Sequence, residues 1–291
     1  MPGKNIKTMI WNITIMAVVI SGLISVDTAS AAEPAFDYRQ YATVLNQYVN
    51  EDGLVNYSAL KSNRQSLDKF ILAIGDLSES QFRQWNSQEQ VGFLINAYNA
   101  IALLRIINHY PIEPSFPQSF LYPDNSIRQI DGVFDDITTE VMNRQMTLDY
   151  IEHEILRKKY TEPRIHMALV CAAMSCPPLC TEPYTGEQLD SQLEHQTRTF
   201  LKNPSGFRMN REEGVVYLSS IFKWFGEDFI QPYDAPEFQR FSEKESTVLK
   251  FISEYLNEED RMYLESSEYK VKYLKYDWSL NTQKSQQAGV Q

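Results

Sequence analysis

The chain has 291 residues, of which 43% are apolar and 12% are aromatic, and its formal net charge is −11 at pH 7. This composition supplies enough apolar material for a buried core, so it excludes a collagen, a low-complexity chain and a disordered acidic chain. The negative charge argues against a nucleic-acid-binding protein, which usually needs a basic face, and against adhesion to anionic lipid.

The N-terminus has the pattern of a secretory signal. Two lysines among the first seven residues precede a mostly apolar run over 9–26, and small residues follow at 28–32. The run also approaches the length of a membrane anchor. We expect residues 1–32 to be a signal peptide that is cleaved. The mature protein would then be extracytoplasmic, periplasmic or secreted, free of the membrane, and in a compartment where disulfides persist.

The rest of the chain shows no internal repeat and no Gly/Ser-rich linker. We therefore expect one domain over 36–281, followed by a frayed polar tail over 282–291. Helices are predicted at 37–49 and 66–76, with a short extended piece at 54–57 between them.

The clearest predicted helix covers 88–108 and is apolar almost all round, so it should be buried. The sequence His109-Tyr110-Pro111 should end it. Loops with short strands are expected over 112–146. A second helix should begin at Thr147, a plausible N-cap, and run to about Lys158.

The second half of the chain mixes helices and strands without a βαβ rhythm, which indicates an α+β fold. A strand is predicted at Arg164–Val170, and a loop stiffened by prolines follows at 171–183. The further predictions are helices at 186–202, 220–225 and 243–257, and strands at 214–218 and 269–276.

The three cysteines, Cys171, Cys176 and Cys180, lie within ten residues and allow three interpretations. One is a disulfide plus an odd thiol, and a second is a zinc site. The usual Cys-x2-Cys spacing and a second ligand cluster are absent, so we expect no metal and no cofactor. The third is a thiol nucleophile, which needs a base and a group that orients the base.

His166 is the candidate base, ten residues before Cys176. If 164–170 is a strand, the Cys171 side chain points to the opposite face and lies far along it. Cys176 can return to His166 only if the chain reverses near Ala172–Ser175. This reasoning favours Cys176 as the nucleophile.

Glu152 is the candidate orienting group, because it falls inside the apolar stripe of the helix that begins at Thr147. A carboxylate on such a stripe needs a partner. That partner is either the His166 imidazole or, in a structural alternative, Arg157 or Arg164. His153, on the flank of the same helix, is an alternative base, a supporting residue or simply exposed.

Asn96 and Asn99 share a face of the buried helix, where amides must be hydrogen-bonded. They are candidates for donating to an oxyanion or substrate, although a structural tie to a loop backbone is the more common use of such amides. The aromatic run 222–229 either lines a cleft or belongs to the core.

Five motifs together resemble the domain of unknown function 547 family: Phe93–Ala100, Ile151–Arg157, His166–Cys171, Ser175–Leu179 and Tyr276–Asn281. The resemblance implies a papain-like, cysteine-peptidase-type fold, a single α+β domain with a buried central helix and an antiparallel sheet. It also implies a catalytic group made of Glu152, His166 and Cys176, with His153 as a possible further member.

In many relatives an arginine is expected where this chain has Cys180. A bond between Cys171 and Cys176, or between Cys176 and Cys180, would inactivate the site until it is reduced. The sequence thus favours a redox-sensitive thiol hydrolase, a cysteine peptidase or amidase with a peptide or amide substrate. The alternative is a non-catalytic binding module on the same scaffold, stapled by a disulfide.

Overall fold

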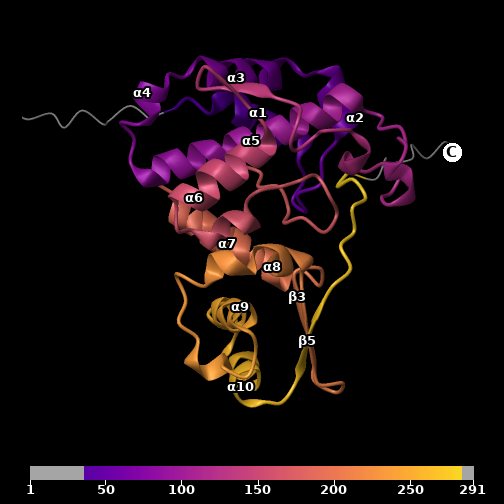
Figure 1. Cartoon of the computed structure of the whole chain (residues 1–291). Helices are drawn as coiled ribbons and strands as arrows, with labels where there is room; N and C mark the ends of the chain where they lie inside the picture. The colour runs from indigo at the N-terminus through magenta and orange to yellow at the C-terminus, as the bar shows by residue number, and fades with distance from the viewer. Residues whose placement is uncertain (1–35, 284–291) are drawn as a thin grey trace, which may run out of the picture. The chain divides into compact units, whose positions relative to one another are not determined.

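The computed structural model describes residues 36–283. The predicted signal peptide and positions 284–291 of the predicted tail lie outside the described residues. The α-helices are α1 (Arg39–Tyr48), α2 (Tyr57–Ser62), α3 (Gln65–Asp76), α4 (Glu79–Phe82), α5 (Ser87–His109), α6 (Arg157–Lys159), α7 (Leu189–Lys202), α8 (Ser220–Phe225), α9 (Glu243–Ser253) and α10 (Glu258–Ser266). Figure 1 shows their arrangement.

Short helical segments connect them: η1 (Gln118–Phe120), η2 (Ile127–Gln129), the π-helix η3 (Tyr150–Leu156), η4 (Pro163–Met167), η5 (Gly226–Phe229) and η6 (Pro236–Phe238). The strands are β1 (Thr139–Val141), β2 (Arg144–Met146), β3 (Phe207–Asn210), β4 (Val215–Leu218) and β5 (Lys270–Tyr273). The predicted α+β class is therefore confirmed.

The strands form two small sheets in the described part of the chain. β1 and β2 are an antiparallel pair, and β3, β4 and β5 make a three-stranded sheet in that order. β3 and β4 are antiparallel, but β4 and β5 run parallel, with Val215 opposite Lys270. The expectation of a purely antiparallel sheet is thus wrong at β5, because α8, α9 and α10 form a crossover that returns the chain in the parallel direction.

Helix α5 is buried over almost its whole length, as predicted. It begins at a capping box in which Asn86 and Glu89 bond to each other's backbone, and it ends before Tyr110-Pro111. It is long and apolar enough to span a membrane, yet 89% of its most apolar stretch is covered by the fold, as in the core helix of a folded domain. Gly92 allows the backbone of Tyr184 to approach α5 closely.

Two hydrophobic cores lie on either side of η4. The first core collects the buried apolar side chains of 41–193 except Ala102 and Met167, and adds Leu280. The second core collects those of 200–269 except Val215, and adds Met167. α1, α2, α3 and α5 pack together around the first core, and α8, α9 and α10 pack around the second. The segment before residue 168 therefore contributes to both cores.

Two predicted elements differ from the structure. The predicted strand Arg164–Val170 is wrong: residues 163–167 form the helical turn η4, with Pro163 in its first turn and the Glu162 side chain accepting from the Arg164 amide. The helix predicted from Thr147 exists, and the Thr147 hydroxyl accepts from the Tyr150 amide, but residues 150–156 are wound as a π-helix.

The C-terminal segment continues past β5 and returns to the first core. Leu280 pairs with Ala173, and Thr282 pairs with Val55. The Gln283 side chain donates to the carbonyls of Tyr48 and Leu54. Residues 282 and 283 are thus held by the fold, which corrects the expectation that the frayed tail begins at 282.

Candidate active site

A pocket of about 180 Å³ lies where residues of the two cores meet. Helices α5, α8 and η3, the loops around η2 and 169–176, and the C-terminal segment all contribute to it. The lining residues are Tyr98, Arg128, Phe134, Asp149, Glu152, His153, His166, Leu169, Cys171, Cys176, Ile221, Trp224, Phe225, Tyr276 and Trp278. The pocket therefore brings Glu152, His153, His166, Cys171 and Cys176 of the sequence prediction together.

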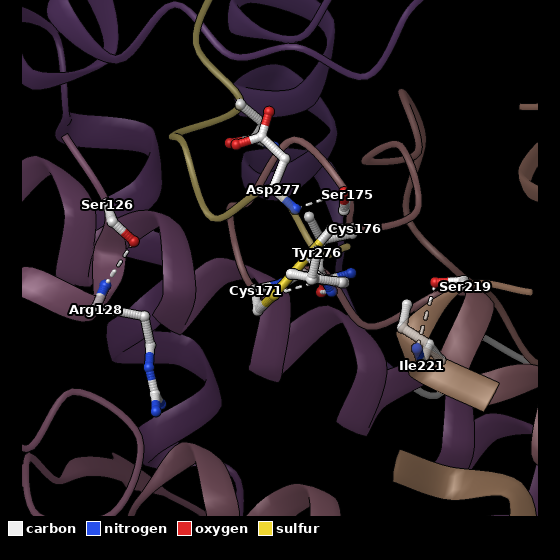
Figure 2. The surroundings of a disulfide bond; sticks show 12 residues. Ser126, Arg128, Cys171, Ser175, Cys176, Ser219, Ile221, Tyr276 and Asp277 are labelled. Atoms are coloured by element: carbon white, nitrogen blue, oxygen red, sulfur yellow. Dashed lines mark hydrogen bonds between the residues drawn. A yellow bond between two sulfur atoms is a disulfide. The ribbon is translucent and has the colours of Figure 1, made fainter. Parts of the chain in front are cut away.

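The cysteine loop reverses direction where the sequence argument required it. Ala172 adopts a left-handed conformation with φ of 59°, and the Cys176 amide donates to the Ala173 carbonyl at 3.0 Å. The Ser175 hydroxyl accepts from the Asp277 amide at 2.9 Å, which ties this turn to the C-terminal segment (Figure 2). The reversal places the Cys176 sulfur in the pocket.

Cys171 and Cys176 are joined as a disulfide, and Cys180 is free. The Cys176 sulfur also accepts from the Cys171 amide at 3.1 Å and lies 3.1 Å from the Tyr276 hydroxyl. Figure 2 shows Tyr276 beside the disulfide. Burial raises the pKa of the Cys180 thiol, which packs against the first core and is not part of the pocket lining.

His166 is held by a carboxylate from the second core. Its Nε2 lies 2.7 Å from Asp228 Oδ2, and its ring stacks on Phe225 with centroids 4.2 Å apart. Among the described residues none makes a hydrogen bond with Nδ1, and His166 lines the pocket. Burial lowers the pKa of His166, although the bond to Asp228 opposes the shift. The imidazole is therefore favoured in its neutral form, which a general base requires.

Asp228 is fixed by Arg157 as well as by His166. The Arg157 guanidinium donates through Nε to Asp228 Oδ2 at 2.6 Å and through a terminal nitrogen to Oδ1 at 2.9 Å. Burial alone would raise the pKa of Asp228, but the hydrogen bonds from His166 and Arg157 outweigh it, so that the pKa is lowered. Asp228 thus remains ionised and orients the imidazole.

Glu152 lies in the pocket but does not occupy the predicted orienting position. Burial raises its pKa to about 7, helped by the nearby Asp149, while the nearby Tyr98 opposes the shift. The group bonded to His166 Nε2 is Asp228, and neither Arg157 nor Arg164 makes an ion pair with Glu152. Glu152 is thus a carboxyl group that carries a proton over part of the neutral range.

His153 stands at the rim of the pocket. Its Nδ1 lies 3.1 Å from an Arg157 nitrogen, and its Nε2 lies 3.9 Å from Asp149. Burial lowers its pKa, although Asp149 opposes this. Because His153 shares Arg157 with Asp228, it belongs to the polar network behind the base and is half exposed.

Asn96 and Asn99 hold loop backbone, as the structural interpretation predicted. Asn96 donates to the Tyr184 carbonyl at 2.7 Å and accepts from the Tyr184 amide at 2.9 Å. Asn99 donates to the Ala168 carbonyl and accepts from the Val170 amide, each at 2.9 Å. Neither side chain lines the pocket, so an oxyanion role for them is wrong.

The roles of Tyr276, which lines the pocket, and Asp228, which bonds to His166, were not predicted from the sequence. Asp228 sits in the aromatic run 222–229, where the aromatic residues indicated core. A carboxylate inside an apolar run needs a partner, and this rule, applied to Glu152, would also have singled out Asp228. Tyr276 appeared only within a family motif.

The described residues hold no group of three or more His, Cys, Asp or Glu side chains arranged to bind a metal ion. The fold and pocket define an α+β protein with a cysteine pair, a histidine and carboxyl groups around one cavity. The family model described as "Protein of unknown function, DUF547" matches residues 82–201. This match confirms the resemblance over residues 82–201, which contain four of the five motifs, whereas Tyr276–Asn281 lies beyond them.

The matched segment includes α5, His166 and all three cysteines, whereas Asp228 and Tyr276 lie beyond it. No curated protein and no solved structure gives a significant match to the chain.

Proposed function

We propose that this protein is an extracytoplasmic thiol hydrolase, a cysteine peptidase or amidase on a papain-like scaffold, whose nucleophile is Cys176. The observation that carries the proposal is the convergence on one pocket of the Cys176 sulfur and a His166 ring whose Nε2 is bonded to Asp228. A nucleophile, a neutral base and an ionised orienting carboxylate are the three groups that thiol catalysis needs.

In the proposed reaction a dithiol first reduces the Cys171–Cys176 bond and is itself oxidised to a disulfide. His166 then takes the Cys176 proton, and the thiolate attacks the substrate carbonyl carbon. The carbon–nitrogen bond breaks, and His166 returns the proton to the leaving amine. Water, deprotonated by His166, then hydrolyses the thioester to a carboxylic acid and restores the thiol.

Two hydrogen-bond donors lie close to the Cys176 sulfur, and both can stabilise the negative charge of its thiolate. The Cys171 amide lies 3.1 Å from the sulfur, and the Tyr276 hydroxyl is equally close. Burial raises the pKa of Tyr276, which keeps its hydroxyl proton available for donation. Protonated Glu152 is a further donor toward the carbonyl oxygen.

The disulfide itself favours the second candidate, a non-catalytic binding module. With Cys171 and Cys176 bonded, neither sulfur is a nucleophile. If this bond is permanent, the pocket binds a ligand without cleaving it, and the disulfide acts as a staple for the loop. Reduction should then lower the melting temperature without producing a reactive thiol.

Selective alkylation separates the two candidates. The purified protein, with and without prior reduction, is treated with limiting iodoacetamide at pH 6, below the ordinary thiol pKa of about 8.5, and the label is located by peptide mass mapping. We expect rapid labelling of Cys176 only after reduction. Asp228→Asn should slow it about tenfold, because the base loses its orienting charge.

Glu227→Gln is the matched control, since Glu227 also pairs with Arg157, at 3.1 Å, but does not contact His166. It should leave the labelling rate unchanged. Equal labelling of all three cysteines after reduction, or a Cys176 rate that survives His166→Ala, would overturn the hydrolase and leave the binding module.

A further inference from the structure

One cation in the pocket has no part in the chemistry described above. Arg128 follows the first residue of η2, and its amide donates to the Ser126 hydroxyl at 3.1 Å (Figure 2). Its guanidinium lies over three aromatic rings, 4.9 Å from the Tyr122 centroid, 5.1 Å from Trp278 and 5.5 Å from Phe134. These rings hold the charge at the pocket wall.

Arg128 makes one side-chain hydrogen bond, to the Tyr122 hydroxyl at 2.9 Å. Within residues 36–283 no carboxylate lies within 4 Å of it, whereas Arg157 and Arg164 each pair with two. A guanidinium has five N–H donors in one plane, and its faces are the part that aromatic rings cover. Most of these donors are therefore left for a ligand that approaches in the plane.

The position of Arg128 suits a substrate-binding group. It lines the pocket that contains Cys176, and it also lines an adjoining hollow of about 510 Å³. A ligand that reaches the cysteine can therefore continue past Arg128. Asp149 borders both hollows, and burial raises its pKa, while His153 and Arg128 oppose the shift. The other acid of the pocket is Glu152, which is protonated over part of the neutral range.

We propose that Arg128 binds a carboxylate of the substrate, so that the site acts on peptides or amides that carry a carboxylate near the bond to be cleaved. Two parallel N–H donors of an arginine match the two oxygens of a carboxylate. This inference rests on the proposed function. It also implies that the pocket selects an anion although the whole chain carries a charge of −11.

Paired alkylating probes test the proposal without a known substrate. N-bromoacetyl derivatives of glycine, β-alanine and 4-aminobutyrate place a carboxylate at increasing distances from the reactive carbon, and their amides are the neutral partners. Each rate at reduced Cys176 is divided by the rate of the same probe with glutathione. We expect one length to react about tenfold faster as the acid than as the amide, because a charge-assisted bidentate pair is strong.

Arg128→Gln should reduce this acid-to-amide ratio to about one, and Arg128→Lys should restore part of it. The control is Arg144→Gln: Arg144 also bonds a tyrosine hydroxyl, that of Tyr150, at 3.2 Å, and lies over its ring, but it is outside the pocket. Melting temperatures of all variants show whether the fold is kept.

N-bromoacetyl-aspartate amide and N-bromoacetyl-alanine distinguish a side-chain carboxylate from a terminal one. A ratio near one for every probe in the native protein, with Cys176 still reactive, would overturn the Arg128 proposal alone. A Cys176 that reacts with no probe faster than glutathione does would overturn the proposed function instead. A ratio that persists in Arg128→Gln would assign the preference to another residue and refute the role of Arg128.

Discussion

Two sets of polar side chains lie beside the cysteine loop and its flanks, and they differ in their chemistry. On one side, Asn96 and Asn99 of α5 bond only to backbone groups, with both the donor and the acceptor of each amide used. On the other side are ionisable groups: His166 bonds to the Asp228 side chain, and both His166 and Glu152 border a cavity.

The difference shows which kinds of buried polar side chain indicate a structural role and which indicate a chemical one. An amide that satisfies a loop backbone has no protonation state to change, so it stabilises the fold and does little else. A buried acid or base can still exist in two protonation states, and its surroundings shift its pKa. Shifted groups around a cavity are therefore the better indicator of chemistry.

The largest expected effect is on the amide side. Asn99→Ala removes two hydrogen bonds and leaves the Ala168 carbonyl and the Val170 amide buried without partners, at a cost of about 2–5 kcal/mol in the free energy of unfolding. Urea denaturation measures it. The control Asn63→Ala removes an exposed bond to the Ala59 carbonyl and should cost less than about 1 kcal/mol. Equal losses would contradict the structural role.

The next largest expected effect is that of Glu152 on the free energy of unfolding, and it depends on pH. The pKa of Glu152 is raised from 4.5 to about 7, so the folded state keeps a proton that the unfolded state has lost. Below pH 4.5 the carboxyl group is protonated in both the folded and the unfolded state, so its shifted pKa does not change the stability. As the pH rises to 7 and above, the free energy of unfolding falls by up to about 3 kcal/mol.

Glu152→Gln removes this dependence, so its stability relative to the native protein should increase over the same range. Denaturation curves at pH 4.5 and 7.5 measure the difference. The control is Glu154→Gln, an exposed acid on the same helix paired with Lys158, which should give a much smaller change. No change for Glu152→Gln would place the shifted group elsewhere.

The smallest expected effect is that of removing the Cys180 thiol, which lies outside the pocket that contains Cys176. Cys180 packs against the first core and lies outside the pocket lining, so Cys180→Ala should lower the free energy of unfolding by only about 1 kcal/mol. The rate of Cys176 alkylation in the reduced protein should not change. A loss of Cys176 reactivity in this variant would mean that the two thiols work together, which would break the comparison.

The comparison also shows what the sequence could predict. Local rules were enough for α5 and its buried amides, because an apolar run with two polar residues three apart has few structural solutions. Proximity of Cys176 to the His166 pocket was predicted through the turn near Ala172. The predicted strand at 164–170 is wrong because Pro163 favours the first turn of a helix, and this preference outweighs the alternation that follows it.

Long-range partners were beyond such rules. Asp228 lies 62 positions from His166, and no pattern in either segment states that they meet. Glu152 was correctly singled out as a carboxylate on an apolar stripe, but the structure pairs it with neither His166 nor an arginine, and burial raises its pKa instead. A sequence shows that a buried charge needs compensation, while the fold decides which side chain provides it.

The segment after β5 contributes a wall of the pocket that is synthesised after the other walls. Tyr276 and Trp278 form part of the wall, and Leu280 pairs with Ala173 inside the cysteine loop. These are among the last of the described residues to leave the ribosome. The nascent chain can therefore bury α5 and most of the first core while the pocket is still open on one side, and the site is completed only after Leu280 has left the ribosome.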